Sequence, residues 1–282
     1  MHSSQIKSNA LAAIKRISPK PLRLWREAAY FRRNGEFELR LVESLCESRR
    51  DSIDVGANLG AYVHFMRRSS RQVYAFEPIP WLAEELARKF PSRVIVRNLA
   101  VSNETGSATL HVPLVEGEAE TGLASLGRPT RSMSGEYMRL LVPTCRLDDA
   151  YKGNVGFIKI DVEGCEQAVL DGAVGTIDRC RPNILVEIEE RFASGSIERT
   201  TRFLAEIGYR GYFVDRRTLN EIEKFDPASM QRSEDIEGFA AGMARSRFGG
   251  YVNNFIFIDR AKELEILPRM NAVLAKERLK NS

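Results

Sequence analysis

The sequence predicts an α/β fold in which a mostly parallel sheet of seven strands is flanked by helices. Short apolar runs alternate along the chain with segments whose apolar residues recur at helical spacing, and this alternation is typical of strand-helix-strand units. A glycine-rich turn directly follows the first apolar run, where a buried strand passes into a helix in sheets of this class. The length of 282 residues suits one main domain with additions.

The expected elements follow one another in a regular order. Strands are expected at residues 51–55, 73–76, 94–96, 156–161, 183–189, 211–214 and 253–258. Helical stripes lie at residues 37–45, 62–66, 82–90 and 197–207, and Gly208 ends the last of them. We therefore divide the chain into a basic and helical N-terminal extension (1–50), a central domain (51–260) and a charged C-terminal helix (261–282).

An insertion interrupts the alternation between residues 108 and 149. Residues 108–112 and 139–142 have strand-like patterns and enclose a stretch rich in glycine, serine and charge. Loops of this length are commonly lids or disordered segments, so residues 122–126 either close over a substrate or form a surface excursion. A second segment, at about residues 216–248, is polar and is expected to be irregular.

The turn after the first strand indicates a cofactor site. Gly56 and Gly60 permit a sharp turn and a close approach of the backbone to a ligand, and the following helix presents free N–H groups and the positive end of its dipole. A pyrophosphate site would show Gly-x-Gly-x-x-Gly, whereas Asp54 and Asn58 occupy two of those glycine positions here. An acidic side chain repels phosphate but suits a ligand with an amine or a sulfonium, such as S-adenosylmethionine.

A second carboxylate, Glu77, ends the next strand, about twenty residues after the glycine-rich turn. Nucleotide-binding folds have an acidic residue at about this distance from the turn. A carboxylate at this place can accept hydrogen bonds from both ribose hydroxyls, although an ordinary solvated strand end carries the same residue type. Pro78 stops the strand because it has no N–H. The polar residues after the third strand, Asn98 to Ala100, lie where adenine is bound in such a fold.

Charged residues also lie at the ends of the fourth and fifth predicted strands. Lys159 and Asp161 alternate along one strand and point to the same face, where they form either a reactive pair or a structural ion pair. Glu163 follows in the next turn, and Glu187 and Glu189 share a face of the fifth strand. Such neighbouring carboxylates could bind a divalent cation such as Mg²⁺ through Asp161, Glu187 and Glu189, or orient a hydroxyl and act as its base.

Composition and charge exclude several classes of protein. The four cysteines form no C-x-x-C pair, so neither a zinc site nor a disulfide framework is indicated. No apolar run approaches the ~20 residues of a membrane-spanning helix, and we expect a soluble, cytoplasmic protein. A basic block precedes the first acidic residue, Glu27, and could contact an anionic surface or stay solvated. Its members are Lys7, Lys15, Arg16, Lys20, Arg23 and Arg26.

Five ordered blocks give the sequence a family resemblance. They are residues 54–60 (DVGANLG), 76–78 (FEP), 159–166 (KIDVEGCE), 169–173 (VLDGA) and 181–188 (RPNILVEI). Over roughly residues 52–258 the chain resembles the FkbM family of S-adenosylmethionine-dependent methyltransferases. The resemblance implies a class I Rossmann-like methyltransferase, usually acting on a hydroxyl of a sugar or secondary metabolite, whose last strand lies antiparallel between its neighbours.

The resemblance also implies roles for individual residues. The donor-binding residues would be Asp54, Gly56, Ala57, Asn58, Gly60, Glu77, Pro78, Asn98, Ala100 and Asp161. The catalytic residues would be Asp161, Lys159, Glu163 and Glu187. Asp161 would orient or deprotonate the acceptor, whereas the lone His64 is interpreted as a packed helix residue. Residues 1–35 and 216–248 lie outside the resemblance and are expected to influence the choice of substrate.

Other functions stay open on the sequence alone. A nicotinamide-dependent oxidoreductase would need the tighter glycine spacing, which is missing. A nucleic-acid methyltransferase would explain the basic block, yet the loop that clamps a flipped base amine is absent after the fourth strand. A protein methyltransferase and a non-catalytic adenosyl-binding module are the remaining alternatives. The motifs specify neither the acceptor nor the oligomeric state.

Overall fold

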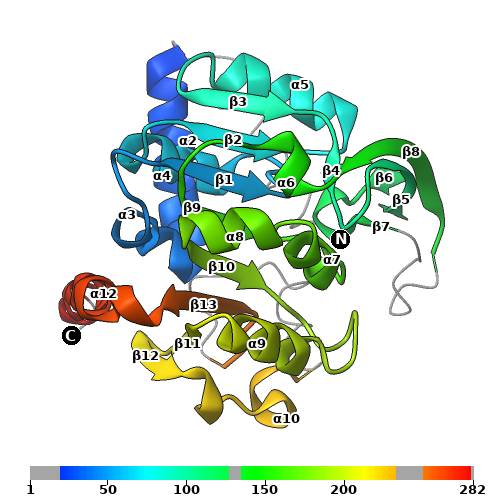
Figure 1. Ribbon diagram of the computed structural model, residues 1–282. Helices are drawn as coiled ribbons and strands as arrows, with labels where there is room; N and C mark the ends of the chain where they lie inside the picture. Colours follow the sequence, from blue (N-terminus) through cyan, green and yellow to red (C-terminus); the bar gives the residue numbers. More distant parts are fainter. Residues whose placement is uncertain (1–19, 127–134, 233–249, 281–282) are drawn as a thin grey trace.

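A central sheet of eight strands organises the computed structural model, which describes residues 20–126, 135–232 and 250–280. In spatial order the strands are β12 (Thr218–Glu221), β11 (Tyr209–Asp215), β13 (Asn254–Asp259), β10 (Asn183–Glu187), β9 (Val155–Ile160), β1 (Asp51–Val55), β2 (Val73–Phe76) and β3 (Val94–Arg97) (Figure 1). The strands from β10 to β3 are parallel. β13 runs antiparallel to both β10 and β11, which confirms the expected reversal.

The sheet has one strand more than the seven expected. β12 pairs antiparallel with β11 at the sheet edge, inside the segment that we expected to be irregular. The chain reverses there through Arg216 and Arg217, whose φ angles are 45° and 62°. Positive φ at two successive positions is the geometry of a tight hairpin turn, in which asparagine and glycine are the favoured residues. Because two arginines occupy this turn, the sequence did not indicate a hairpin here. Further along lie η3 (Ile222–Lys224) and α10 (Pro227–Met230), and residues 233–248 of that prediction fall outside the described residues.

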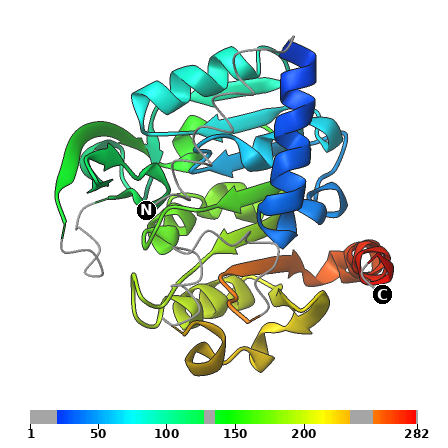
Figure 2. The same cartoon turned by 180° about the vertical axis from the view of Figure 1, so that it is seen from behind.

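Helices cover the two faces of the sheet in two groups. The first group is α6 (Leu147–Ala150), α7 (Glu166–Asp171), α8 (Val174–Cys180) and α9 (Ser196–Glu206). The second is α2 (Lys20–Asn34), η1 (Phe37–Arg40), α3 (Val42–Leu45), α4 (Ala61–Ser69), α5 (Pro80–Lys89) and, after η5 (Arg260–Lys262), α12 (Glu263–Leu279). The first group packs on Ile158 and Ile184, the second on Phe157 and Leu185, and α2 lies across that second face (Figure 2). Because neighbours in a strand point to opposite faces, strands buried on both sides read as continuous apolar runs.

The insertion forms a smaller sheet beside the carboxyl ends of β1 and β2, which the arrowheads mark in Figure 1. Its two long strands, β5 (Gly106–Val115) and β8 (Tyr137–Cys145), pair antiparallel with Leu110 opposite Leu140, as their sequence patterns indicated. The short elements are β4 (Ala100–Val101), β6 (Glu118–Ala119), η2 (Thr121–Leu123) and β7 (Ser125–Leu126). The insertion therefore stands at the edge of the sheet where ligands gather in parallel α/β folds.

The basic N-terminal block is only partly visible. Lys7, Lys15 and Arg16 lie outside the described residues, whereas Arg23 and Arg26 lie on α2. No helix in the described part of the chain is both long and apolar enough to cross a membrane.

Candidate functional site

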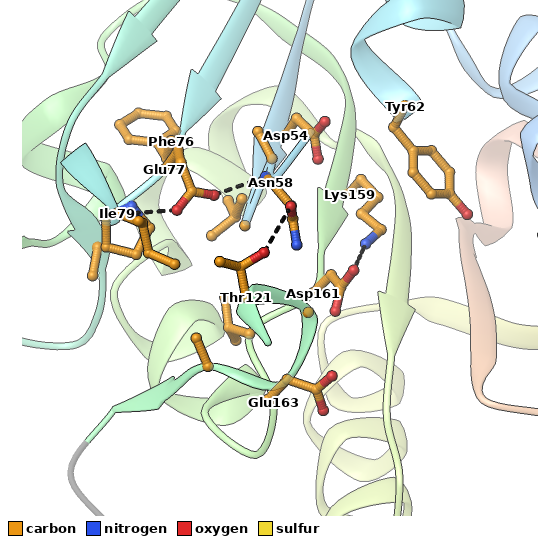
Figure 3. A pocket seen from close by; sticks show the side chains of 18 of the residues that line it. Asp54, Asn58, Tyr62, Phe76, Glu77, Ile79, Thr121, Lys159, Asp161 and Glu163 are labelled. Atoms are coloured by element: carbon orange, nitrogen blue, oxygen red, sulfur yellow. Dashed lines mark hydrogen bonds and ion pairs between the residues drawn. The ribbon is translucent and has the colours of Figure 1, made fainter. Parts of the chain in front are cut away.

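A cavity of about 300 Å³ opens at the carboxyl ends of the central strands. Its walls come from the turn after β1, the end of β2, the loop after β9, the end of β10 and residues of the insertion. A volume of this size falls at the lower end of the range for small-molecule sites. Figure 3 shows Glu77 and Ile79 on one side of Asp54 and Asn58, with Lys159 and Tyr62 on the other side.

The glycine-rich turn has the backbone geometry that its spacing predicted. Gly56 has a φ of 81°, and a Cβ built there would lie 1.9 Å from the carbonyl oxygen of Asp161. Gly60 has a φ of 77°, and its Cβ would lie 2.7 Å from a methyl carbon of Leu86. Asn58, between them, has a φ of 44°, a conformation in which asparagine is enriched. The turn can therefore pass close to β9 and α5 only because two of its residues lack side chains.

Glu77 joins the turn after β1 to the turn after β2. Its Oε2 accepts a hydrogen bond from the N–H of Asn58 at 2.7 Å, and its Oε1 accepts one from the N–H of Ile79 at 2.8 Å (Figure 3). Burial raises the pKa of Glu77 to about 7, although the two N–H donors favour the charged form. Asn98 donates from Nδ2 to the carbonyl oxygens of Glu77 and Pro78 at 2.9 and 3.0 Å. Asn98 thus braces this turn and is not part of the cavity wall, unlike Ala57, Pro78 and Ala100.

A buried polar network lies on the other side of the cavity from Glu77. Asp54 and Lys159 are register partners on β1 and β9, and each is 1% exposed. The Nζ of Lys159 donates to Oδ2 of Asp161 at 2.5 Å and lies 4.8 Å from the ring centre of Tyr62 (Figure 3). Burial alone would lower the pKa of Lys159, but Asp161, Glu187 and other carboxylates outweigh it and raise that pKa. The ammonium group therefore stays charged inside the protein.

Asp54 carries a buried oxygen atom with no hydrogen-bond partner among the described residues. This atom, Oδ2, belongs to a carboxylate that lines the cavity. Burial raises the pKa of Asp54 to about 7; the ammonium of Lys159 opposes this rise, and the carboxylates of Asp161 and Glu77 add to it. A buried acceptor without a donor costs roughly 1–3 kcal/mol. The atom is therefore suited to accept a hydrogen bond from a ligand, and a positively charged donor would satisfy it best.

Glu163 occupies the turn after β9, where Glu163 and Gly164 both have positive φ angles of 45° and 87°. Its side chain lines the cavity. Burial, together with the carboxylates of Asp161 and Glu189, holds the pKa of Glu163 well above its usual range. Glu166 supports the turn, since its Oε1 accepts a hydrogen bond from the N–H of Gly164 at 2.6 Å. The site therefore contains a carboxyl group with a raised pKa beside one that is ion-paired with lysine.

The hydrogen-bonded pair of Tyr62 and Glu36 in the cavity wall was not among the predicted site residues. Tyr62 was assigned to an apolar helix face, and its ring is buried, but its hydroxyl donates to Oε2 of Glu36 at 2.7 Å. Glu36 lies between α2 and η1 and also lines the cavity, as does Phe31 of α2. No motif marks Glu36, because its place in the site depends on how the N-terminal extension packs against α4.

The insertion contributes to the site rather than forming a separate excursion. The residues of the insertion that line the cavity are Leu110, Thr121, Gly122, Ala124 and Leu126. The hydroxyl of Thr121 donates to Oδ1 of Asn58 at 3.5 Å and so links the insertion to the glycine-rich turn (Figure 3).

The alternative of a Mg²⁺ site is not supported. Asp161 is bonded to Lys159, and Glu189 is paired with Arg191 at 2.5 Å and lies outside the cavity wall. Glu187 does line the cavity, at the end of β10. Within residues 20–126, 135–232 and 250–280, no three His, Cys, Asp or Glu side chains form a group that could hold a metal ion. Lys159 and Arg191 already pair with two of the three carboxylates that such a metal site would need.

Comparisons with known proteins agree with the motifs. The family model described as the methyltransferase FkbM domain matches residues 54–210. Among solved structures, the chain is similar to methyltransferase FkbM from Methylobacillus flagellatus KT, with 15% identity and a TM-score of 0.46 over 88% of this chain. It spans only 58% of the length of that protein. No curated protein matches the sequence.

Two further solved structures are similar at lower identity. One is an rRNA methylase from Streptococcus thermophilus, with 9% identity and a TM-score of 0.41 over 79% of this chain and 94% of that one. The other is a protein from Streptococcus mutans, described as a methyltransferase and solved in complex with SAH, with 8% identity and a TM-score of 0.42 over 78% of this chain and 94% of that one.

Proposed function

The chain belongs to the family of FkbM methyltransferases, and we propose that it transfers the methyl group of S-adenosylmethionine to a hydroxyl oxygen of a sugar, a glycan or a secondary metabolite. The observation that carries this proposal is the buried Oδ2 of Asp54, which has no hydrogen-bond partner among the described residues and belongs to a residue that lines a carboxylate-rich cavity. A ligand with an ammonium and a sulfonium group fits such a lining. When bound, S-adenosylmethionine supplies a methyl group on a positively charged sulfur.

The donor would be held along the cavity from Glu77 to Asp54. Glu77 would bind the ribose hydroxyls, since each of its oxygens accepts one backbone N–H and a carboxylate oxygen can accept a second hydrogen bond. The apolar side chains of Ile79 and Leu99 would cover the adenine ring. The backbone of residues 56–60 and the carboxylate of Asp54 would bind the amino-acid part. Every residue in this assignment except Gly60 lines the cavity.

Asp161 would orient the acceptor hydroxyl or remove its proton. Methyl transfer is a direct displacement by oxygen, so alignment of the reacting groups and removal of one proton are the main tasks of the protein. The bond to Lys159 uses Oδ2 of Asp161, and no hydrogen bond within the described residues uses its Oδ1. Lys159 would therefore fix the carboxylate while Oδ1 stays available to the acceptor.

A labelled-methyl transfer assay tests the proposed function. The full chain is incubated with S-adenosylmethionine labelled in the methyl group and with a panel of glycans, lipid-linked sugars and polyketides. We expect label in at least one acceptor, and we expect calorimetry to detect binding of S-adenosylmethionine and S-adenosylhomocysteine. Binding of NAD, with no binding of either adenosyl compound, would contradict the proposal.

The Glu77→Gln variant should bind S-adenosylmethionine at least tenfold more weakly than the wild type, a loss of about 1.4 kcal/mol. An amide would turn an NH₂ group toward one of the two backbone N–H donors that the carboxylate now accepts. It would also weaken the acceptor for the ribose. Calorimetric titration measures the effect, and Glu84→Gln, on the exposed side of α5, serves as the control. Equal affinity in wild type and Glu77→Gln would remove Glu77 from the donor site.

Donor affinity should weaken as the pH falls from 8 to 6. The pKa values of Asp54 and Glu77 are both about 7, so both carboxylates lose charge over this range. Because the ionised forms are those that would accept hydrogen bonds and balance a cationic ligand, protonation competes with binding. Each group can then change the association constant by up to about tenfold per pH unit below its pKa. Calorimetry at pH 6, 7 and 8 measures the effect, and a constant affinity would show that neither carboxylate must be ionised.

A further inference from the structure

The outward face of α2 carries apolar side chains. Leu22 and Trp25 are three residues apart on this helix, which places them on one face, and they are 41% and 61% exposed. The single acidic residue of α2, Glu27, is buried and pairs with His64 and Lys89. The outward face of α2 therefore presents an aliphatic and an indole side chain and no carboxylate of its own.

Three arginines lie beside this face. Arg67 and Arg68 are in the last turn of α4, which packs against α2, and Arg93 directly precedes β3. In both views the start of β3 lies beside the N-terminal half of α2 (Figures 1 and 2). Burial lowers the pKa of Arg67, and the nearby charges of Arg68 and Arg93 lower it further. Positive charge is thus concentrated at the amino ends of the strands, away from the cavity at their carboxyl ends.

The arginines lack acceptors on the protein. Within the described part of the chain, no group pairs with or accepts a hydrogen bond from the guanidinium groups of Arg67, Arg68 and Arg93. Nε of Arg67 is buried without an acceptor, and its guanidinium group lies 5.7 Å from the ring centre of Phe90. Cations that repel one another and have no carboxylate partner favour an external anion, which supplies the missing acceptors.

Phosphate groups and acyl chains together suit this combination of side chains. Guanidinium groups form charge-assisted and often bidentate hydrogen bonds with phosphate. Tryptophan prefers the boundary between lipid headgroups and acyl chains, and an aliphatic side chain gains from the acyl chains as well. A soluble phosphate would leave both apolar side chains in water, and a nucleic acid would stack on the indole but gain little from the aliphatic group.

We propose that this surface of the protein binds the headgroup layer of an anionic lipid bilayer. The residues that form it, named here the α2 surface, are Leu22, Trp25, Arg67, Arg68 and Arg93. Binding to the bilayer does not depend on the methyl transfer proposed above. Phe31 of the same helix lines the cavity, so a bound bilayer would lie against a helix that borders the cavity.

Co-sedimentation with lipid vesicles tests the proposal. The full chain is mixed with vesicles of phosphatidylcholine alone or of phosphatidylcholine with phosphatidylglycerol, and the bound fraction is measured at increasing lipid concentration. We expect binding to the vesicles with phosphatidylglycerol to be at least about tenfold tighter and to weaken as salt is added. Equal binding to both kinds of vesicle, or binding to neither, would overturn the proposal.

The Arg68→Gln/Arg93→Gln double variant assigns the binding to the α2 surface. Both side chains are exposed, so the thermal unfolding midpoint should stay at the wild-type value. Affinity for the anionic vesicles should fall about fivefold for each arginine, and at least about tenfold in the double variant. The matched control is Arg216→Gln/Arg217→Gln, in the turn between β11 and β12 at the opposite edge of the sheet, which should bind as the wild type does. Unchanged affinity in the first variant, or equal losses in both, would show that the α2 surface is not the binding site.

The fluorescence of Trp25 distinguishes a bilayer from other anionic ligands. The chain has two tryptophans, so the Trp81→Phe variant leaves Trp25 as the single indole reporter. We expect its emission to shift to shorter wavelength when anionic vesicles are added, because the indole passes from water to the headgroup region. Inorganic phosphate and single-stranded RNA should give no such shift. An unchanged emission with vesicles, or an equal shift with RNA, would rule out the bilayer as the specific partner of this surface.

Discussion

The Asp161→Asn variant is expected to lose at least nine-tenths of its turnover while binding the methyl donor as the wild type does. A positioned general base contributes roughly 10²- to 10⁴-fold to rate, and asparagine cannot accept the proton of a hydroxyl. Its carbonyl oxygen can still accept a hydrogen bond from Lys159, which now bonds to Oδ2 of Asp161. Turnover with a saturating acceptor measures the effect, and calorimetry measures donor affinity.

Two further measurements separate the role of Asp161 in the reaction from a role in folding. Asp178→Asn, on the surface of α8, changes the same chemical group far from the cavity wall and should leave turnover unchanged. The thermal unfolding midpoint of Asp161→Asn should fall, because buried Lys159 loses its ion-pair partner, so turnover is compared at a temperature at which both proteins are folded. Wild-type turnover in Asp161→Asn would remove this residue from the mechanism. A parallel loss of donor affinity would assign it to the donor site instead.

The parts of the site that depend on backbone geometry could be predicted from the sequence. Gly56 and Gly60 stand where a side chain would collide with β9 or α5, and only glycine relieves both collisions. Glu77 ends a strand of clear apolar pattern, so its position followed from the period of that strand. The places of these residues in the fold could be predicted because glycine spacing and the apolar pattern of a strand are local features of the sequence.

Side chains that reach the site by packing between distant segments could not be predicted. Glu36 meets Tyr62 because α2 and η1 pack against α4, and no spacing in the sequence records that contact. Asn98 was expected near the cavity from its polar type and its place after the third strand. Its side chain instead donates hydrogen bonds to two backbone carbonyl oxygens and does not line the cavity. The edge strand β12 was not predicted for a different reason: two arginines, rather than glycine or asparagine, form its hairpin turn.

A buried ionic cluster attaches the N-terminal helix to the glycine-rich turn. Glu27 of α2 is 2% exposed, and its Oε2 lies 3.3 Å from Nε2 of His64 and 3.2 Å from Nζ of Lys89. Lys89 also donates to the carbonyl oxygen of Leu59, in the glycine-rich turn, at 2.7 Å. Because a carboxylate only accepts hydrogen bonds, Nε2 of His64 must carry the proton. Burial lowers the pKa of His64, and the side chain is buried outside the cavity wall, so this histidine is a packed residue rather than a base for the reaction.

The Glu27→Gln variant should be less stable than the wild type by about 3–5 kcal/mol, since removing one partner of a buried ion pair leaves the other charge uncompensated. Urea unfolding at pH 7 measures the loss. The double variant Glu27→Leu/Lys89→Met should recover part of it, because replacing both buried charges by apolar groups is often nearly neutral. Glu198→Gln, in the exposed pair with Arg202, should cost only about 0.3–0.5 kcal/mol. Equal losses in Glu27→Gln and Glu198→Gln would contradict the importance of the buried cluster.

The stability difference between wild type and Glu27→Gln should depend on pH with a definite sign. Burial opposes the charge of Glu27, but the hydrogen bond from His64 and the ammonium of Lys89 outweigh it and lower the pKa to about 2, below the ordinary value of 4.5. A carboxylate with a lowered pKa in the folded state stabilises the protein above its unfolded-state pKa and loses this effect as it is protonated. The difference should therefore be constant from pH 8 to about 5 and shrink between pH 4.5 and 2. Urea unfolding of both proteins is measured across this range, and in the difference between them the contributions of the other carboxylates to the pH dependence cancel. A difference that grows on acidification would show that Glu27 is protonated in the folded protein at neutral pH.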